Sequence, residues 1–195
     1  MPKIIGITGG IGSGKSKVAG YFSELGIPCY TADDRAKYLM NTDAALKESI
    51  VHHFGSECYM DNTLNRSYIA DIIFKDKTAL AKLNALVHPV VGQDFLNWVE
   101  KQNTPYVIKE AAILFESGGA KSCDSIILVT APKKIRIERV LARDNTTVEA
   151  IKDRMSKQWS DSQKTPLADY HIENIVWEET VLKIDAIYEK LMATL

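Results

Sequence analysis

The chain has 195 residues, of which 46% are hydrophobic and 25% are charged. This composition supplies enough apolar side chains for a packed core and excludes an intrinsically disordered chain. The formal net charge of −1 and the pI near 6.4 exclude a strongly basic, nucleic-acid-binding surface. The length fits one domain that carries a smaller inserted lobe.

Targeting and redox features favour a cytoplasmic protein. Three cysteines, Cys29, Cys58 and Cys123, are scattered without a C-x-x-C pair, which is typical of reduced thiols. The apolar run that ends at Thr8 is too short for a signal peptide. No stretch approaches the ~18 apolar residues of a membrane span, so no membrane partner is expected.

The first elements predict a βαβ unit. Residues 4–7 form a short, β-branched run that is typical of a strand buried on both faces. The helix that begins at Lys15 repeats apolar side chains at i, i+4 and i+7, and Gly26 ends it. Residues 27–30 are predicted to form the second strand. A strand, a helix and a strand in this order favour a parallel sheet with a right-handed crossover.

Helical patterns without a clear strand dominate residues 33–100. The predicted helices cover 33–40, 43–54, 66–74, 77–87 and 90–100. Buried strands return at 106–108 and 126–129. We interpret the helical part as an insertion between two strands of the sheet.

The last part of the chain is predicted to be largely helical. A helix with Pro132 as its first residue is expected to turn Leu141 inward. Thr146 and Glu149 form a Thr-x-x-Glu pattern, which predicts a capping box at the next helix. A C-terminal helix follows with its apolar residues on one face. The predicted fold class is α/β, with a parallel sheet flanked by helices.

A phosphate-binding sequence lies at residues 9–16, which we call the phosphate loop. These residues read GGIGSGKS and match G-x-x-x-x-G-K-S without a mismatch, between a strand and a helix. Glycine-rich backbone N–H groups and the positive end of a helix dipole bind phosphate oxygens. The alternative is a chance glycine-rich turn. The residues expected to bind ATP are Gly10, Gly12, Ser13, Gly14, Lys15, Ser16 and Lys17.

Within this loop, Lys15 is expected to act as a catalytic residue that contacts the β- and γ-phosphates, and the Ser16 hydroxyl to bind Mg²⁺. Nucleotide binding alone does not specify the reaction. A GTPase would need N-K-x-D and D-x-x-G sequences, and neither occurs here. A kinase for a small acceptor fits the length and the helical insertion, whereas a nucleotide-dependent switch without turnover is the alternative from another class.

The chain resembles the dephospho-coenzyme A kinase family. The sequence ITGGIGSGKS at residues 7–16 is similar to the opening of these kinases. Further landmarks follow in the family's order across nearly the whole chain: Ala32-Asp33, His88-Pro89, Leu114-Phe115-Glu116, and Ala168-Asp169 followed by Asn174.

The resemblance implies transfer of the γ-phosphate of ATP to the ribose 3′-hydroxyl of dephospho-coenzyme A, with Mg²⁺ as cofactor. The products are coenzyme A and ADP, in the last step of coenzyme A biosynthesis. A P-loop kinase for another small acceptor, such as a nucleoside or nucleotide, is the alternative. We expect a monomer or weak homo-oligomer without a nucleic-acid partner. The implied parts are a P-loop core at about 1–32, 104–143 and 166–195, a helical acceptor-binding lobe at about 33–103, and a small helical lid at about 144–165.

The chain departs from the family's pattern at a few positions. Thr31 replaces the first carboxylate of Asp-Ala-Asp, so its role is lost or is taken by Asp34. Glu110 and Ala112 stand where the family commonly has Asp and Pro. Lys17 replaces the usual Thr. Glu110, which ends the third strand, is expected to hold Mg²⁺ through water. The alternative is that Glu110 is a solvated strand end.

Four residues are expected to contact the acceptor. Asp33 follows the second strand at the edge where doubly wound sheets bind ligands, and as a general base it would accept the hydroxyl proton. An N-cap is its alternative. Arg66, at a helix start, is expected to pair with an acceptor phosphate. His88 matches a family position that would place its imidazole in the acceptor pocket; the alternative is that it simply ends a helix, because it precedes Pro89. Glu116 is expected to contact the acceptor or to cap a turn.

Basic residues near the lid are expected to divide into two groups. Arg136, Arg139 and Arg143 are spaced i, i+3 and i+7 and are predicted to share one helical face. Arg143 matches the family's lid arginine, so it is expected to bind ATP and stabilise the transition state. Arg136 and Lys157 are expected to be solvated. Asn174 matches the family's adenine-contacting asparagine, and a turn-forming role is its alternative.

Overall fold

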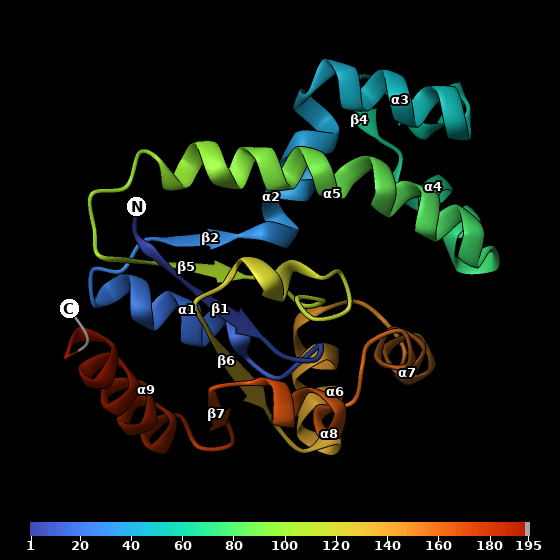
Figure 1. Ribbon diagram of the computed structural model, residues 1–195. Coiled ribbons are helices and arrows are strands. Elements are labelled where there is room, and N and C mark those ends of the chain that lie inside the picture. Colours follow the sequence, from blue (N-terminus) through green and yellow to red (C-terminus); the bar gives the residue numbers. More distant parts are fainter. Residues whose placement is uncertain (194–195) are drawn as a thin grey trace. The chain divides into compact units, whose positions relative to one another are not determined.

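The structure, a computed structural model, describes residues 1–193, apart from the side chains of Phe74 and Lys77. It divides into two compact units (Figure 1). The first unit comprises Met1–Thr31 and the chain from Gln102 onward, and the second comprises Ala32–Lys101. Across residues 1–193, none of the helices combines the length and apolar character that a membrane span requires.

The first unit is built on a five-stranded, fully parallel sheet with the order β2-β5-β1-β6-β7. The strands are β1 (Lys3–Thr8), β2 (Cys29–Thr31), β5 (Tyr106–Glu110), β6 (Ser125–Thr130) and β7 (Tyr170–Glu173). The connection from β1 runs toward β2, and the connection from β6 runs toward the opposite edge at β7. The carboxyl ends of the neighbouring strands β1 and β6 therefore form a switch point, where parallel sheets bind ligands.

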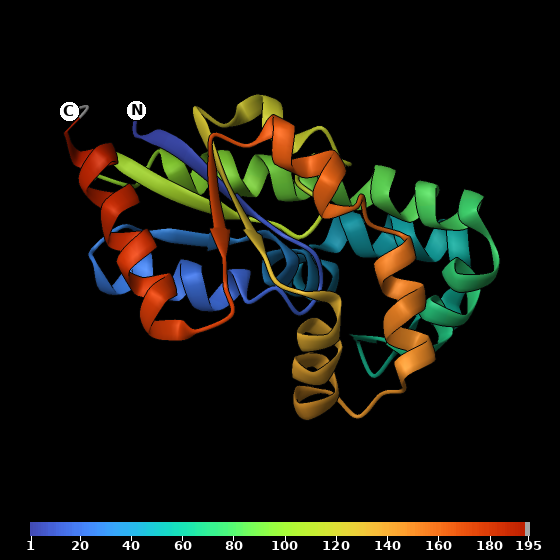
Figure 2. The same cartoon turned by 90° about the horizontal axis from the view of Figure 1, so that it is seen from below.

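Helices α1 (Lys15–Glu24) and α9 (Trp177–Met192) share the main core of this unit with the sheet. Figure 2 shows α9 in red beside the strands. The core joins fully buried strand residues such as Ile7 and Ile127 to Phe22 of α1 and Ile184 of α9. Three further α-helices of the unit come between β6 and β7 in the chain: α6 (Lys133–Arg143), α7 (Val148–Ser156) and α8 (Asp161–Lys164).

The second unit is mainly helical. Its helices are α2 (Ala32–Thr42), α3 (Ala44–Phe54), α4 (Arg66–Lys75) and α5 (Lys77–Val99). Arg35 of α2 binds Asp94 of α5 through two hydrogen bonds of 2.9 and 2.6 Å, which join these helices. A short hairpin of β3 (Tyr59–Met60) and β4 (Thr63–Leu64) turns at Asp61 and Asn62, which both have positive φ. The sequence prediction missed this hairpin and also β7.

The predicted helix break at His88-Pro89 is wrong, because α5 runs without interruption through Pro89. A proline inside a helix removes one backbone hydrogen bond and costs about 3 kcal/mol. Buried apolar side chains recur every four residues on both sides of the proline, at Leu83, Val87, Val91, Phe95 and Val99. Packing of this continuous stripe offsets the local cost and keeps the two halves as one helix.

Three predicted details of α6 and α7 are also wrong. Thr147 rather than Thr146 caps α7, and its side chain accepts a hydrogen bond from the Ala150 N–H at 3.2 Å. Pro132 is the N-cap of α6 and not its first residue. Leu141 is 40% exposed because α6 buries the face that contains Val140.

Candidate active site

The phosphate loop connects the carboxyl end of β1 to α1 and is shaped by glycines. The Ser13 N–H donates to the Gly10 carbonyl at 3.0 Å, which closes a tight turn. Gly12 has a φ of 78° and Gly14, the N-cap of α1, has a φ of 89°. Both values lie in the left-handed region that favours glycine. The loop therefore has the backbone shape in which successive N–H groups and a helix N-terminus can bind phosphate.

Lys15 and Glu110 form an ion pair beside the loop. The Lys15 Nζ lies 3.3 Å from Oε1 of Glu110, whose side chain is only 2% exposed. Glu110 ends β5, the neighbour of β1, so the parallel register brings the carboxylate to the loop. A buried carboxylate needs a partner of opposite charge, and Lys15 supplies it.

An oxygen ligand set for Mg²⁺ is present at the same edge. Ser16 is the second residue of α1 and is exposed, and Glu110 offers a carboxylate. Mg²⁺ in kinases is usually held by one or two protein oxygens, with phosphates and water completing its shell. Ser16 and Glu110 fit that donor set.

Asn174 and Arg139 both bind the phosphate loop at the Ser13 carbonyl. Asn174 is buried, donates to the Ser13 carbonyl at 2.8 Å and accepts from the Thr180 hydroxyl at 3.2 Å. Arg139 donates to the carbonyls of Asn174 at 3.0 Å and Ser13 at 3.5 Å. The predicted adenine contact of Asn174 stays a prediction. Its amide already fixes Ser13, which the family resemblance did not suggest.

Arg136 is not a solvated surface residue, and that prediction is wrong. Its side chain is 11% exposed and forms an ion pair with Asp161 at 3.3 Å. Its Nε donates to the Ile11 carbonyl at 2.8 Å. The reason is the position of α6, whose first turn packs directly against the loop. Lys157 is exposed, as expected, and pairs with Asp153.

Glu116 anchors the segment around α8. Its Oε1 forms an ion pair with Lys164 Nζ and accepts a hydrogen bond from the Trp159 N–H, both at 2.9 Å. The Lys164 side chain is 0% exposed and also donates to the Ala112 carbonyl at 3.3 Å. Sequence analysis missed Lys164, because a lysine in a polar run has the pattern of a surface residue. The acceptor contact of Glu116 stays a prediction.

Arg143 and Lys17 have other partners in this structure. The Arg143 side chain is 65% exposed and binds the adjacent Asp144 carboxylate with hydrogen bonds of 2.8 and 3.1 Å. This contact raises the pKa of Arg143 and lowers the pKa of Asp144. The Lys17 Nζ lies 3.8 Å from the centre of the Trp177 ring. The roles predicted for Arg143 and Lys17 in ATP binding stay predictions.

The predicted acceptor residues of the second unit lie on three different helices. Asp33 is half-buried within the first turn of α2 rather than ahead of it, so it is not an N-cap. Arg66 is the exposed first residue of α4, where Asn65 makes the cap. His88 is exposed in the middle of α5. In the described part of this unit, none of these three side chains has an ion-pair partner.

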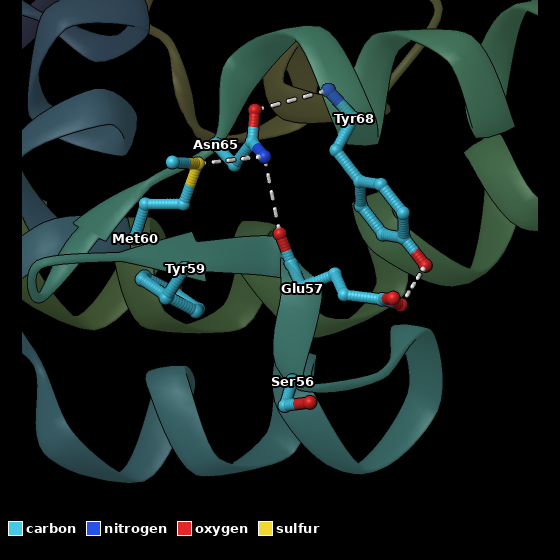
Figure 3. Close-up of a pocket in the computed structure, with 6 residues that line it drawn as sticks. All are labelled: Ser56, Glu57, Tyr59, Met60, Asn65 and Tyr68. Atoms are coloured by element: carbon cyan, nitrogen blue, oxygen red, sulfur yellow. Dashed lines mark hydrogen bonds between the residues drawn. The ribbon is translucent and has the colours of Figure 1, made fainter.

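The second unit also contains a depression of about 500 Å³ (Figure 3). Its lining residues are Ser56, Glu57, Tyr59, Met60, Asn65 and Tyr68. The Tyr68 hydroxyl donates to Glu57 at 3.0 Å, and the Asn65 side chain caps α4. The Tyr68–Glu57 bond joins α4 to the turn that precedes the hairpin, and the predicted acceptor residues do not line the depression.

Sequence comparisons identify relatives along most of the chain. Residues 3–178 match the profile of the family described as Dephospho-CoA kinase. A curated dephospho-CoA kinase of Porphyromonas gingivalis is 42% identical over 154 residues, which cover 79% of this chain and 76% of that protein. One of Bacteroides fragilis is 37% identical over 171 residues, which cover 87% and 83%.

Structural comparisons agree on the fold. A crystal structure of a Thermus thermophilus protein has a TM-score of 0.85 and 30% identity, and covers 100% of this chain and 98% of its own. A dephospho-CoA kinase of Campylobacter jejuni has a TM-score of 0.70 at 24% identity, with 98% of both chains covered. A shikimate kinase of Acinetobacter baumannii in complex with shikimate has a TM-score of 0.57 at 16% identity, with 100% of this chain and 96% of that chain covered. The last two show a shared fold.

Proposed function

The chain belongs to the dephospho-CoA kinase family, and we propose that it transfers the γ-phosphate of ATP to the ribose 3′-hydroxyl of dephospho-CoA. The products are coenzyme A and ADP. The observation that carries this proposal is a complete phosphate loop, with Lys15 paired to Glu110, inside a family match that spans residues 3–178.

The donor half of the reaction uses the phosphate loop. The loop N–H groups and the N-terminus of α1 would bind the phosphates of ATP, and Lys15 would contact the β- and γ-phosphates. Lys15 is already held beside the loop by Glu110, so it needs little reorganisation when charge develops on the transferred group. Mg²⁺, when bound, neutralises phosphate charge, and Ser16 and Glu110 are the residues that would hold it.

The acceptor half depends on a base. The 3′-hydroxyl oxygen attacks the γ-phosphorus, the bond from that phosphorus to ADP breaks, and the hydroxyl proton passes to Asp33. Along the chain, only Ala32 separates Asp33 from Thr31, the last residue of β2, which supports this choice of base. Asp34 is less suited, because its exposed carboxylate pairs with Lys37 at 2.7 Å.

Further contacts complete the proposal. Arg66, His88 and Glu116 would bind dephospho-CoA, and Asn174 and Lys17 would contact ATP. Arg143 would reach the transferred phosphate when the segment at about 144–165 closes as a lid. We place the reaction in the cytoplasm, which is supported by the three free cysteines.

Acceptor screening with labelled ATP tests the proposal. The purified protein is incubated with Mg²⁺, γ-labelled ATP and one acceptor at a time: dephospho-CoA, shikimate, a nucleoside or a nucleotide. We expect transfer to dephospho-CoA, with coenzyme A identified by mass spectrometry, and loss of transfer in Lys15→Ala. A higher kcat/KM for another acceptor, or ATP hydrolysis without transfer, would overturn the proposed substrate.

A further inference from the structure

Both backbone groups of Ile11, at the tip of the phosphate loop, are bound by side chains from the segment between β6 and β7. The Ile11 carbonyl accepts a hydrogen bond from Arg136 Nε at 2.8 Å. The Ile11 N–H donates to Oε1 of Gln158 at 2.9 Å. Two residues that lie more than a hundred positions away along the chain therefore hold the two peptide planes on either side of the Ile11 Cα.

The bond from Arg136 has a directional consequence for Gly12. The turn closed by the Ser13 N–H and the Gly10 carbonyl has Gly12 at a φ of 78°, as in a type II turn. The peptide between Ile11 and Gly12 is the central peptide of this turn, and its orientation distinguishes type II from type I. In a trans peptide the C=O and N–H point in opposite directions. Arg136 therefore directs the Gly12 N–H away from α6.

The packing around Arg136 matches this role. A Cβ at Gly10 would overlap the Arg136 guanidinium, and a Cβ at Gly12 would overlap the Arg136 carbonyl. Arg136 itself is held by Asp161 of α8 at 3.3 Å. The first turn of α6 therefore packs against Gly10 and Gly12 and restricts the conformation of the loop there.

The backbone next to Gln158 is anchored. Its neighbour Trp159 donates its N–H to Glu116 at 2.9 Å, and the same carboxylate is paired with the buried Lys164. Gln158 thus lies at the end of an anchored stretch of chain. Its carboxamide can hold the Ile11 N–H at low entropic cost.

We propose that Arg136 and Gln158 are positioning residues for the reaction, which fix the two peptides around Ile11 so that the Gly12 N–H faces the nucleotide phosphates. The proposal rests on the proposed function, because it assumes that ATP binds at this loop. Because the loop is already oriented before the nucleotide arrives, it binds a β- or γ-phosphate more tightly. Contacts to the rest of the nucleotide are unaffected.

Binding of ADP and AMP to the purified full-length protein tests this proposal by calorimetry. AMP has no β-phosphate to place in the loop, so a loop defect should weaken ADP and spare AMP. We expect Arg136→Ala to weaken ADP binding about tenfold, the size of a lost hydrogen bond to a charged group, and to leave AMP binding unchanged. Arg136→Lys should recover part of the loss, because an ammonium can still donate to the Ile11 carbonyl.

Lys134→Ala, which removes an exposed cation from the same helix, is the matched control and should bind both nucleotides normally. Amide hydrogen exchange supplies a second readout. Gln158→Ala should speed exchange at the Ile11 N–H and leave the Ser13 N–H protected, because that group bonds to the Gly10 carbonyl.

Equal losses for ADP and AMP in the Arg136 variants, or unchanged exchange at Ile11 in Gln158→Ala, would overturn the positioning role. If Arg136→Ala fails to fold, Arg136→Lys and Gln158→Ala decide the question. The measurements use no acceptor, so they stand whether or not dephospho-CoA is the substrate. A wild-type protein that binds ADP no better than AMP would instead overturn the proposed function.

Discussion

Side chains around the phosphate loop already have hydrogen-bond or ion-pair partners. The predicted acceptor residues of the second unit differ from them in this respect. Around the loop, Lys15 binds Glu110, Asn174 binds Ser13, and Arg136 binds Ile11. In the described part of the second unit, Asp33 and Arg66 have no ion-pair partner, and both lie at helix starts.

This difference indicates how each region would contribute to the reaction. Hydrogen bonds and an ion pair hold the loop to its supports, so the donor end is preorganised and a change there affects the fold as well as the activity. Asp33 and Arg66 have no ion-pair partner in the described part of the second unit, so a change at either should affect activity and leave stability nearly unchanged. Each prediction below tests this division.

The largest effect is expected for Lys15→Ala. Loss of the cation should lower kcat by at least about 10²–10³-fold, the typical cost of removing one transition-state contact. It should also lower the free energy of unfolding by on the order of 3 kcal/mol, because Glu110 is left buried without this partner. Steady-state kinetics and urea unfolding measure the two effects.

The double variant Lys15→Ala/Glu110→Gln separates the two roles of Lys15. Neutralising Glu110 should restore much of the stability while the activity stays lost. If Lys15→Ala is as stable as the wild type, the network view of the donor end is wrong.

Asp33→Asn should have the next largest effect. Loss of the base should lower kcat about 10²-fold. The melting temperature should hardly change, because the side chain is half-buried and without an ion-pair partner in the described part of its unit. Asp34→Asn, beside it, is the matched control and should keep its turnover. Normal turnover in Asp33→Asn would exclude Asp33 as the base.

Arg143→Ala tests the predicted lid and should lower kcat less than the two variants above. We expect kcat and kcat/KM to fall together, about tenfold, with little change in the KM for ATP, since one charge-assisted contact is lost only in the transition state. Stability should stay within ~0.5 kcal/mol, because the side chain is largely exposed. Lys134→Ala on the same helix is the silent control. A raised KM with an unchanged kcat would show that Arg143 binds ground-state ATP instead.

The last prediction concerns the pH dependence of stability. Burial and the nearby Glu110 carboxylate raise the pKa of Cys29 from 9.0 to about 12. The folded state then keeps a thiol proton that the unfolded chain releases, so this contribution is complete below pH 9 and is lost as the pH rises toward 12. The loss is at most about 1.4 kcal/mol per pH unit. The free energy of unfolding, measured from pH 8 to 10.5, should fall more steeply with pH in the wild type than in Cys29→Ala. Equal slopes for the two proteins would contradict this.

The sequence predicts the phosphate loop and its flanking elements well because their determinants are local. The residues of the phosphate loop are consecutive, and the strand before it and the helix after it are recognisable from short apolar patterns. The supports of the loop are different. Arg136 contacts Ile11 across 125 positions, and only the packing of α6 decides that this arginine is buried while Arg143 stays exposed.

Other misses have the same physical origin. β7 is a short strand whose partner in the sheet is β6, a pairing that local propensity does not reveal. The break expected at Pro89 follows the local rule for proline, but the buried stripe of α5 overrides it. Lys164 pairs with Glu116 across 48 positions, so its burial depends on tertiary structure.

Hydrogen–deuterium exchange, resolved by peptide, tests most directly whether the two regions bind the two substrates. A non-hydrolysable ATP analogue should slow exchange in residues 9–18, where phosphates meet the loop amides, and leave 66–99 unchanged. Dephospho-CoA should slow exchange in the second unit, first of all around Asp33 in α2. Protection by dephospho-CoA confined to the first unit would contradict the assignment of the acceptor to residues 32–101.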